Sequence, residues 1–420
     1  MTIATDPPAR SRLDSAALDA VLRGAVDSGG VPHVAAIVAD RDGVIYEGAA
    51  GPRAVGEDDP LTTDTRFRLM SMTKMVCTTV ALQQVERGNL DLDACVDEYL
   101  PEFADLQVLE GFDGDTPRLR APVTRATVRH LITHTSGLAY WFWNADIVRF
   151  EQATGTPNVM SGSKQIFTAP LVADPGDRFE YGINTDWLGR VVEAASGRSL
   201  DDYLREHILG PLGMDATSFL MSAEQRANSV PIHLRGEDGA WAPSDTDWSQ
   251  EPEWWAAGHG LYSTPRDYMR FQRMLLGGGT LDGARILDAA TVAAAFTNQI
   301  GELDFPPAIA AADPDTTADF NAGPGCKWGL GLLLNSEQQT GMRAAGSGAW
   351  AGIFNSHFWV DPTSGVTGAI YTQTLPFVEP RVFQVYVDFE RALYTSLGEG
   401  SVRSRRFERV PEEASQPTQR

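Results

Sequence analysis

Cysteine is scarce in this chain of 420 residues, and the three cysteines lie far apart: Cys77, Cys95 and Cys326. No two of them have CxxC spacing, and their odd number gives no complete disulfide framework. The HExxH pattern is absent, and no cluster of Cys, His and acidic residues has the spacing of zinc ligands. The sequence therefore predicts neither a disulfide-stapled fold nor a metalloenzyme.

Long apolar runs are missing as well. No stretch of 18 apolar residues could form a transmembrane helix, and residues 1–12 lack the apolar core of a secretory signal. Because the cysteines also form no disulfide pattern, we expect a soluble cytoplasmic protein with reduced thiols.

Positive charge is in short supply. Lys and Arg number 34 against 56 Asp and Glu, which gives a net charge of −22. So negative a surface argues against nucleic acid and against anionic membranes as partners. The hydrophobic fraction of 43% is ordinary for a globular protein, and the length allows one large or two ordinary domains with a substantial core.

One short segment carries recognisable chemistry: Ser71-Met72-Thr73-Lys74. Apolar residues recur every three to four positions after it, which predicts a helix from Ser71 to about Gly88. Residues 71 and 74 would then lie one turn apart on the same face, with the hydroxyl at the positive end of the helix dipole. An unassisted serine is a poor nucleophile, but a lysine whose pKa is lowered can serve as its base.

The Ser-x-x-Lys pattern alone is weak evidence, because the chain contains it twice. Ser161-Gly162-Ser163-Lys164 is the second copy, and its Gly and Ser flanks, with no apolar period after them, predict a loop. Taken alone, Ser71 could equally be an ordinary serine that caps a helix. The rest of the chain has to decide between these alternatives.

Strand-like segments occur at both ends of the sequence and a helical, loop-rich block lies between them. This order predicts an α/β (α+β) fold, in which one antiparallel sheet, built from both ends, is flanked by the terminal helices. We expect a sheet domain from residues 13–68 and 255–397, with 69–254 inserted as a helical domain. Residues 1–12 are predicted to form a flexible lead and 398–420 a disordered tail. Ser71 would lie where the chain passes between the two domains, at a cleft.

Several motifs occur in an order that resembles the serine β-lactamase and penicillin-binding-protein superfamily, and most closely the class C β-lactamases and family VIII carboxylesterases. They are Ser71-Met72-Thr73-Lys74, Leu131-Ile132-Thr133-His134-Thr135-Ser136-Gly137-Leu138, Pro175-Gly176 with Phe179 and Tyr181, Gly260-Leu261-Tyr262-Ser263-Thr264, and Phe358-Trp359-Val360-Asp361-Pro362. The resemblance spans roughly residues 15–397. Five ordered matches are far more specific than Ser-x-x-Lys alone.

The resemblance implies a catalytic role for three residues. Ser71 would be the nucleophile, Lys74 its lysine partner and Tyr181 the tyrosine of the second family motif, the proposed general base. Taking a proton at neutral pH requires that the pKa of Tyr181 be lowered, for which the Lys74 ammonium is the expected cause. Without the resemblance, Tyr181 would be read as a buried tyrosine with a satisfied hydroxyl.

Two departures from the family pattern bear on the substrate. The β-lactamases of this class carry Tyr-x-Asn, whereas here Asn184 comes one place late after Tyr181. Their Lys-Thr-Gly is replaced by Trp350-Ala351-Gly352, as in family VIII esterases. Losing the lysine removes a charged hydrogen bond of about 1.5–3 kcal/mol to a substrate carboxylate and, we expect, puts an apolar wall in its place. This substitution favours neutral esters.

Further site residues follow from the same resemblance. The oxyanion hole is expected to consist of the backbone N–H groups of Ser71 and Ile353. We expect Trp350, Gly352 and Trp141 to contact the substrate, with Gly352 allowing the backbone a close approach. For Trp141 the competing interpretation is plain packing.

The sequence thus predicts a serine carboxylesterase that acts on short-chain esters through an acyl-enzyme and needs no metal or cofactor. The expected partner is a small-molecule ester. A β-lactamase or a peptidase acting on D-amino-acid peptides is an alternative, as is an acyltransferase on the same fold, because an alcohol can replace water as acceptor. A non-catalytic binding or sensor domain is a third possibility. The Gly-x-Ser-x-Gly pattern of α/β-hydrolases is absent.

Overall fold

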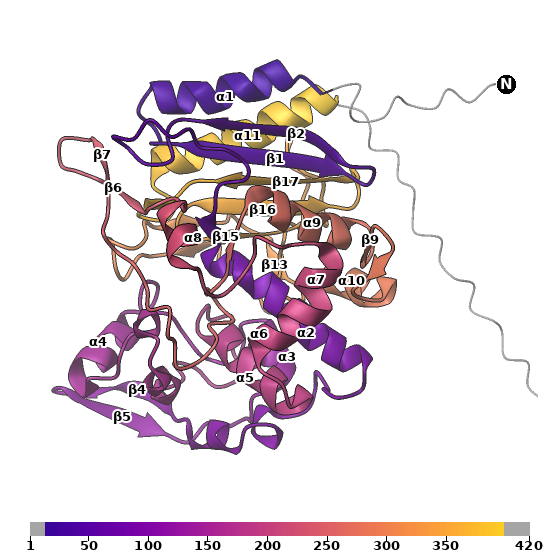
Figure 1. Ribbon diagram of the computed structural model, residues 1–420. Helices are drawn as coiled ribbons and strands as arrows, with labels where there is room; N and C mark the ends of the chain where they lie inside the picture. The colour runs from indigo at the N-terminus through magenta and orange to yellow at the C-terminus, as the bar shows by residue number, and fades with distance from the viewer. Residues whose placement is uncertain (1–12, 399–420) are drawn as a thin grey trace, which may run out of the picture.

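A computed structural model describes residues 13–398 of the chain. The predicted lead 1–12 and residues 399–420 of the predicted tail lie outside the described residues. The fold is built around one seven-stranded sheet in which all neighbouring strands are antiparallel (Figure 1). In sheet order the strands are β13 (Lys327–Trp328), β14 (Leu333–Leu334), β15 (Gly348–Gly352), β16 (Ser356–Asp361), β17 (Val366–Tyr371), β1 (Val34–Asp40) and β2 (Val44–Ala50).

Helices cover both faces of this sheet. The terminal helices α1 (Ser15–Asp27) and α11 (Pro380–Leu397) pack together on one face, and α9 (Pro265–Leu276) packs on the other (Figure 1). Every residue of β1 is buried. Val34, Ala36 and Val38 join the apolar cluster under the terminal helices, and the alternate residues of the strand join the larger cluster on the opposite side. The expected α/β fold with an antiparallel sheet and flanking terminal helices is confirmed.

The larger apolar cluster continues from the sheet into a helical layer, drawn below the sheet in Figure 1. Its centre is α2 (Thr73–Glu86), which is buried on nearly every side and packs against α5 (Asn184–Ser196). The remaining helices are α3 (Val128–Ile132), α4 (Ala145–Thr154), α6 (Leu200–Leu204), α7 (Gly210–Leu212), α8 (Ala223–Ala227) and α10 (Ala289–Ala295). Short 3₁₀ or π turns are η2 (Met70–Met72), η3 (Val96–Glu98), η4 (Pro101–Asp105), η5 (Val159–Ser161), η6 (Lys164–Thr168) and η7 (Arg205–Leu209).

Small sheets of two or three strands lie outside the seven-stranded sheet. They are formed by β3 (Phe67–Arg68) with β8 (Tyr262–Ser263), β4 (Val108–Asp113) with β5 (Thr116–Arg120), β9 (Thr280–Leu281) with β10 (Ala284–Arg285), β11 (Ala308–Ile309) with β12 (Phe320–Asn321), and β18 (Thr374–Leu375) with β6 (His233–Arg235) and β7 (Trp241–Pro243). The last of these small sheets joins 233–243, from the predicted helical block, to 374–375, from the predicted sheet domain. The division into domains at 69 and 254 stays a prediction.

Two stretches of strand-like sequence are each interrupted by a turn. Residues 328–334 read as one strand but form β13, a turn and β14. Glycine explains the turn: Gly331 has φ +88°, and a Cβ at Gly329 would lie 1.9 Å from the carbonyl oxygen of Ala295. Residues 352–360 likewise read as one strand, but a turn at Asn355, whose φ is +62°, separates β15 from β16.

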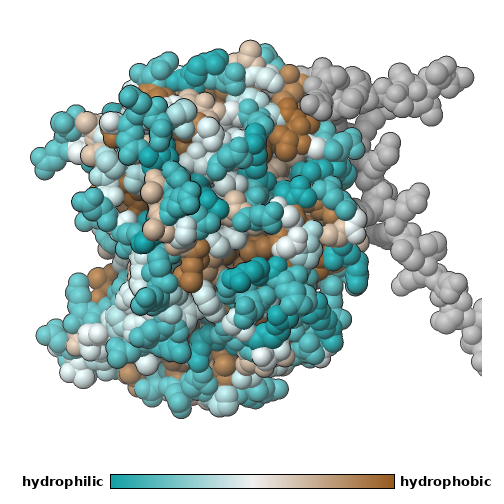
Figure 2. All heavy atoms as spheres, in the orientation of Figure 1, coloured by the Kyte–Doolittle hydropathy of each residue, from teal (hydrophilic) through white to brown (hydrophobic). Residues whose placement is uncertain are grey.

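On the face drawn in Figure 2, hydrophilic residues cover most of the surface and apolar residues form separate patches, several of them near its middle and another at the upper right. No helix within residues 13–398 is both long and apolar enough to cross a membrane.

Candidate active site

The serine of the first motif lies in a tight turn between a strand and a helix. Ser71 is in the 3₁₀ turn η2, and α2 begins at Thr73 rather than at Ser71 as predicted. Met70, just before the serine, has φ +48°, a left-handed conformation that is uncommon for a residue with a side chain. The segment is held by Leu261, whose carbonyl accepts from the Leu69 N–H at 2.9 Å and whose N–H donates to the Thr73 hydroxyl at 3.1 Å. The neighbouring segment therefore fixes both ends of the turn that presents Ser71.

The lysine of the motif reaches back to the serine. Lys74 Nζ donates to Ser71 Oγ at 3.2 Å, to the Tyr140 hydroxyl at 3.0 Å and to the Gly258 carbonyl at 2.9 Å. Its side chain is buried, and burial lowers the pKa of the ammonium to about 7, against an opposing effect of the Asp186 carboxylate. Close to neutral pH, Lys74 can therefore give up and take back a proton beside the serine hydroxyl.

Tyr181 lies next to this pair. The Lys74 ammonium is 4.8 Å from the centre of the Tyr181 ring, and the Tyr181 hydroxyl accepts a hydrogen bond of 2.8 Å from the Trp350 indole N–H. The predicted lowering of its pKa is wrong: burial raises the pKa of Tyr181 above its ordinary value, although contacts with Ser71 and Trp350 lower it. The reason is that the free-energy cost of burying a phenolate exceeds the stabilisation that these contacts give it. Tyr181 is thus a neutral phenol near pH 7, and Lys74 is the group of this pair that changes charge there.

Trp350 packs among aromatic side chains beside Tyr181. Its ring is buried against those of Tyr181 and Trp328, at centroid distances of 4.9 and 4.7 Å, and it is not among the residues that line the cleft at Ser71. Its N–H is committed to the Tyr181 hydroxyl. In this structure Trp350 holds Tyr181 in place, and its contact with substrate stays a prediction.

The absence of a side chain at Gly352 also matters for packing within the protein. A Cβ at this position would lie 2.4 Å from the carbonyl oxygen of Leu69, so the missing side chain lets the end of β15 pack against the segment that carries Ser71. Ile353 follows directly and lines the same cleft as Ser71. Within residues 13–398 neither the Ser71 nor the Ile353 N–H donates a hydrogen bond. Both amides are therefore available for an oxyanion, as an oxyanion hole requires.

The cleft at Ser71 has a volume of about 220 Å³ and is mostly apolar. Trp141 lies in its lining, as predicted for a substrate-contacting residue, and the indole N–H of Trp141 donates to Asp313 at 3.0 Å. The other lining residues are Met70, Tyr140, Phe142, Val159, Met160, Thr246, Trp248, His259, Thr316, Phe354 and Leu375.

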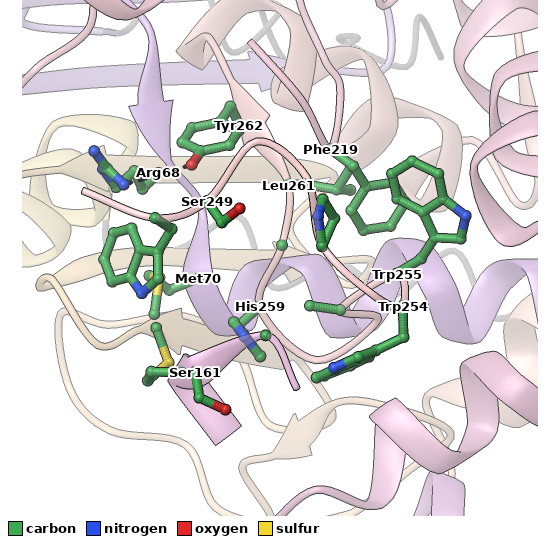
Figure 3. A pocket seen from close by; sticks show the side chains of 16 residues that line it. Arg68, Met70, Ser161, Phe219, Ser249, Trp254, Trp255, His259, Leu261 and Tyr262 are labelled. Atoms are coloured by element: carbon green, nitrogen blue, oxygen red, sulfur yellow. Dashed lines mark hydrogen bonds between the residues drawn. The ribbon is translucent and has the colours of Figure 1, made fainter. Parts of the chain in front are cut away.

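A second, smaller pocket of about 80 Å³ adjoins this cleft (Figure 3). The two share four lining residues: Met70, Met160, Trp248 and His259. Beyond these the second pocket is lined by four large apolar side chains, by smaller residues and by four polar side chains. The apolar four are Phe219, Trp254, Trp255 and Leu261, and the polar four are Arg68, Ser161, Ser249 and Tyr262. Figure 3 places His259 between Met70 and Ser161 on one side and Trp254 on the other. The shared lining makes the two hollows neighbouring compartments.

Four residues of the site were missed by sequence reasoning: Tyr140, Asp186, Gly258 and His259. Tyr140 donates to Asp186 Oδ2 at 3.4 Å, and the Gly258 N–H donates to Asp186 Oδ1 at 2.8 Å. The only sequence signals were a polar first turn in the helix after Tyr181 and the Gly258-His259-Gly260 triplet. Neither signal indicates that these residues lie near Lys74 in the folded chain.

The second Ser-x-x-Lys copy forms no comparable pair. Ser161 ends the turn η5 and Lys164 begins the turn η6, so the predicted loop consists of two short 3₁₀ turns. Ser161 Oγ accepts from the Ser163 N–H, and the Lys164 N–H donates to Glu253, while no hydrogen bond joins the two side chains.

Among the residues that the structure describes, no group of three His, Cys, Asp or Glu side chains is placed to hold a metal ion. The chemistry at Ser71 is that of a hydroxyl, an amine, a phenol and two backbone amides.

Comparisons with known proteins place this arrangement in a family. The Beta-lactamase family profile matches residues 18–393. Monacolin J acid methylbutanoyltransferase of Aspergillus terreus is 32% identical over 417 residues, which cover 91% of this chain and 96% of the relative. Lovastatin esterase of Penicillium rubens is 30% identical over 366 residues, covering 84% and 91%.

A solved structure agrees with these relatives. A variant of the simvastatin synthase LovD from Aspergillus terreus superposes with a TM-score of 0.79 at 29% identity, over 94% of this chain and 99% of the other. The names of these relatives include both an acyltransferase and an esterase. The chain is accordingly a serine enzyme of the acyl-transfer and hydrolysis type, and it belongs to the β-lactamase family.

Proposed function

We propose that the protein is a serine acyltransferase, which moves an acyl group from an ester or thioester donor to an alcohol by way of an acyl-enzyme on Ser71. Ester hydrolysis, the first expectation from the sequence, is the reaction of the same acyl-enzyme with water. The observation that carries the proposal is the contact of 3.2 Å between Lys74 Nζ and Ser71 Oγ inside a cleft with an adjoining apolar compartment.

The first half of the reaction forms the acyl-enzyme. Neutral Lys74 takes the proton of the Ser71 hydroxyl as Oγ attacks the carbonyl carbon, and the amides of Ser71 and Ile353 stabilise the oxyanion. The bond to the leaving alcohol or thiol then breaks. The leaving group takes a proton from the Tyr181 hydroxyl, and the proton that Lys74 took from Ser71 restores the phenol. Because the Trp350 indole donates to the Tyr181 oxygen, the phenol proton is free to be passed on.

The second half reverses these steps with a new oxygen nucleophile. The acceptor alcohol loses its proton to Lys74, its oxygen attacks the acyl carbon, and Ser71 Oγ takes the proton back as its bond to the acyl group breaks. No net proton is released in transfer. Water in place of the alcohol gives a free acid instead.

The second compartment favours an alcohol over water. An acyl group on Ser71 occupies the cleft, and the shared lining at Met70 and His259 leads from there into the pocket of Phe219, Trp254 and Trp255. Apolar surface buried there stabilises a bound acceptor by about 25 cal/mol per Å². A methylbutanoyltransferase among the most similar relatives supports the same choice, and the esterase among them supports the hydrolytic side reaction.

The test measures how one acyl-enzyme divides between acceptors. The enzyme is given a p-nitrophenyl ester of a short acid with rising concentrations of an apolar alcohol such as cyclohexylmethanol, and the new ester and the free acid are quantified. We expect the ester to exceed the acid at millimolar alcohol, and Phe219→Ala to lower transfer more than hydrolysis. Free acid as the sole product at every alcohol concentration would leave a hydrolase. Faster turnover of a chromogenic cephalosporin than of the p-nitrophenyl ester would favour the β-lactamase alternative.

A further inference from the structure

A fully buried carboxylate lies close to the reacting groups and no step described so far uses it. Asp186 has 0% exposure and lies in the first turn of α5. Its side chain accepts from the Gly258 N–H and the Tyr140 hydroxyl, and its nearest cationic candidate is His259 Nδ1 at 3.8 Å. No Lys or Arg within residues 13–398 forms an ion pair with it. Burying a carboxylate without such a partner is costly, so its presence calls for a compensating gain.

Two hydrogen-bonded routes join Asp186 to Lys74, and each passes through one intervening residue. Tyr140 accepts from Lys74 Nζ at 3.0 Å and donates to Asp186. Gly258 accepts from Lys74 at its carbonyl, 2.9 Å away, and donates to Asp186 through its N–H. A Cβ at Gly258 would lie 2.6 Å from Asp186 Oδ2 and 2.9 Å from the Tyr140 hydroxyl, so the closeness of the three depends on a glycine here.

The other titratable groups near Lys74 carry no negative charge at neutral pH. Burial raises the pKa of the Cys77 thiol and of the Tyr140 and Tyr181 hydroxyls above their ordinary values, so all three stay protonated. Burial and the Lys74 ammonium lower the pKa of His134 and of His259, and Asp186 opposes this at His259. Asp186 is therefore the counter-charge of the lysine.

We propose that Asp186 is a positioning residue that, through Tyr140 and Gly258, holds Lys74 against Ser71. Its negative charge also stabilises the ammonium form of Lys74, which burial alone would disfavour. The inference rests on the proposed role of Lys74 as proton carrier. Without the carboxylate, Lys74 would stay neutral down to a lower pH. It could then still accept the proton of Ser71 but would be slow to return one to the leaving group.

The test titrates Lys74 directly. The chain contains only three lysines, Lys74, Lys164 and Lys327, so ¹⁵N-lysine labelling gives few side-chain signals and Lys164 serves as an internal reference. Asp186→Asn preserves the shape and an acceptor oxygen for the Gly258 N–H. We expect it to lower the pKa of Lys74 by about 1–3 units, the size of shift that a nearby opposite charge typically causes. The acid limb of Ser71 labelling by a fluorophosphonate should move by the same amount, while Lys164 does not shift.

A folded Asp186→Asn variant with an unmoved Lys74 titration would overturn the proposal. Should that variant fail to fold, as judged by circular dichroism, Tyr140→Phe carries the test: it removes one of the two connections and is expected to lower the pKa of Lys74 by a smaller amount, and an unchanged value contradicts the proposal. Failure of the fluorophosphonate to label wild-type Ser71 would refute the proposed function instead, and the Lys74 titration would still decide the part played by Asp186.

Discussion

The chain carries Ser-x-x-Lys twice, and the two copies differ in the burial and in the contacts of their serine and lysine side chains. In the first, Lys74 is buried and all three of its protons are donated, one of them to Ser71. In the second, the serine and the lysine lie in separate 3₁₀ turns and their side chains form no hydrogen bond with each other. The comparison teaches that burial and fixed acceptors, rather than the spacing of the two residues, turn the motif into a nucleophile and a base.

Removing the serine gives the largest expected difference between the copies. Ser71→Ala deletes the atom that carries the acyl group, so p-nitrophenyl ester turnover should fall at least about 1,000-fold. Ser161→Ala should leave turnover within about twofold. The measurement is steady-state release of p-nitrophenol by both purified variants; comparable losses in the two would remove the distinction.

Replacing the lysine comes next. Lys74→Met fills the same space without an amine, and loss of the proton carrier should cost about 100- to 10,000-fold in kcat. Lys164→Met is the matched control and should change kcat little. Thermal unfolding of both variants checks that the fold persists. A Lys74→Met enzyme that keeps more than a tenth of its activity would show that another group carries the proton.

The pH dependence should follow Lys74. Its pKa is lowered from that of an ordinary lysine to about 7, and the neutral amine is the active form for acylation. The rate of acylation should therefore be constant above about pH 8 and fall close to tenfold per unit below about pH 6. Pre-steady-state release of p-nitrophenol from pH 5 to 9 measures it. If the acylation rate instead began to fall below about pH 10, the three hydrogen-bond acceptors of Lys74 would outweigh the effect of burial on its pKa.

The smallest effect is expected at Trp350. Trp350→Phe keeps an aromatic ring but removes the N–H that donates to Tyr181, a hydrogen bond worth about 0.5–1.5 kcal/mol. The rate should drop about two- to tenfold with KM nearly unchanged, because the ring does not line the cleft. A large rise in KM instead would support the predicted contact between Trp350 and substrate.

The features that could be predicted from the sequence are those encoded in contiguous motifs. Ser71, Lys74 and Tyr181 were found by their resemblance to a family, and the structure brings them together. The antiparallel sheet was predicted from strand-like segments at the two ends of the chain. Both signals are local or ordered along the chain, so they survive without coordinates.

The rest depends on distances that no local pattern encodes. Asp186 and Tyr140 are 46 residues apart, and their meeting requires the packing of α5 against the segment that follows α3. The direction of the pKa shift at Tyr181 is set by burial, which the sequence did not reveal. Trp350 reads as an apolar residue, and only its orientation shows that its N–H serves Tyr181. The bounds of β13 and β14 depend on close contacts of single glycines.

Acylation of the serine tests the central claim most directly. The enzyme is quenched seconds after mixing with a p-nitrophenyl ester, digested, and its peptides are analysed by mass spectrometry. We predict that the acyl group is found on the peptide that contains Ser71, that it is absent from the peptide of Ser161, and that it disappears when an apolar alcohol is added before the quench. An acyl group on Ser161, or on no serine while p-nitrophenol is released, would contradict the account.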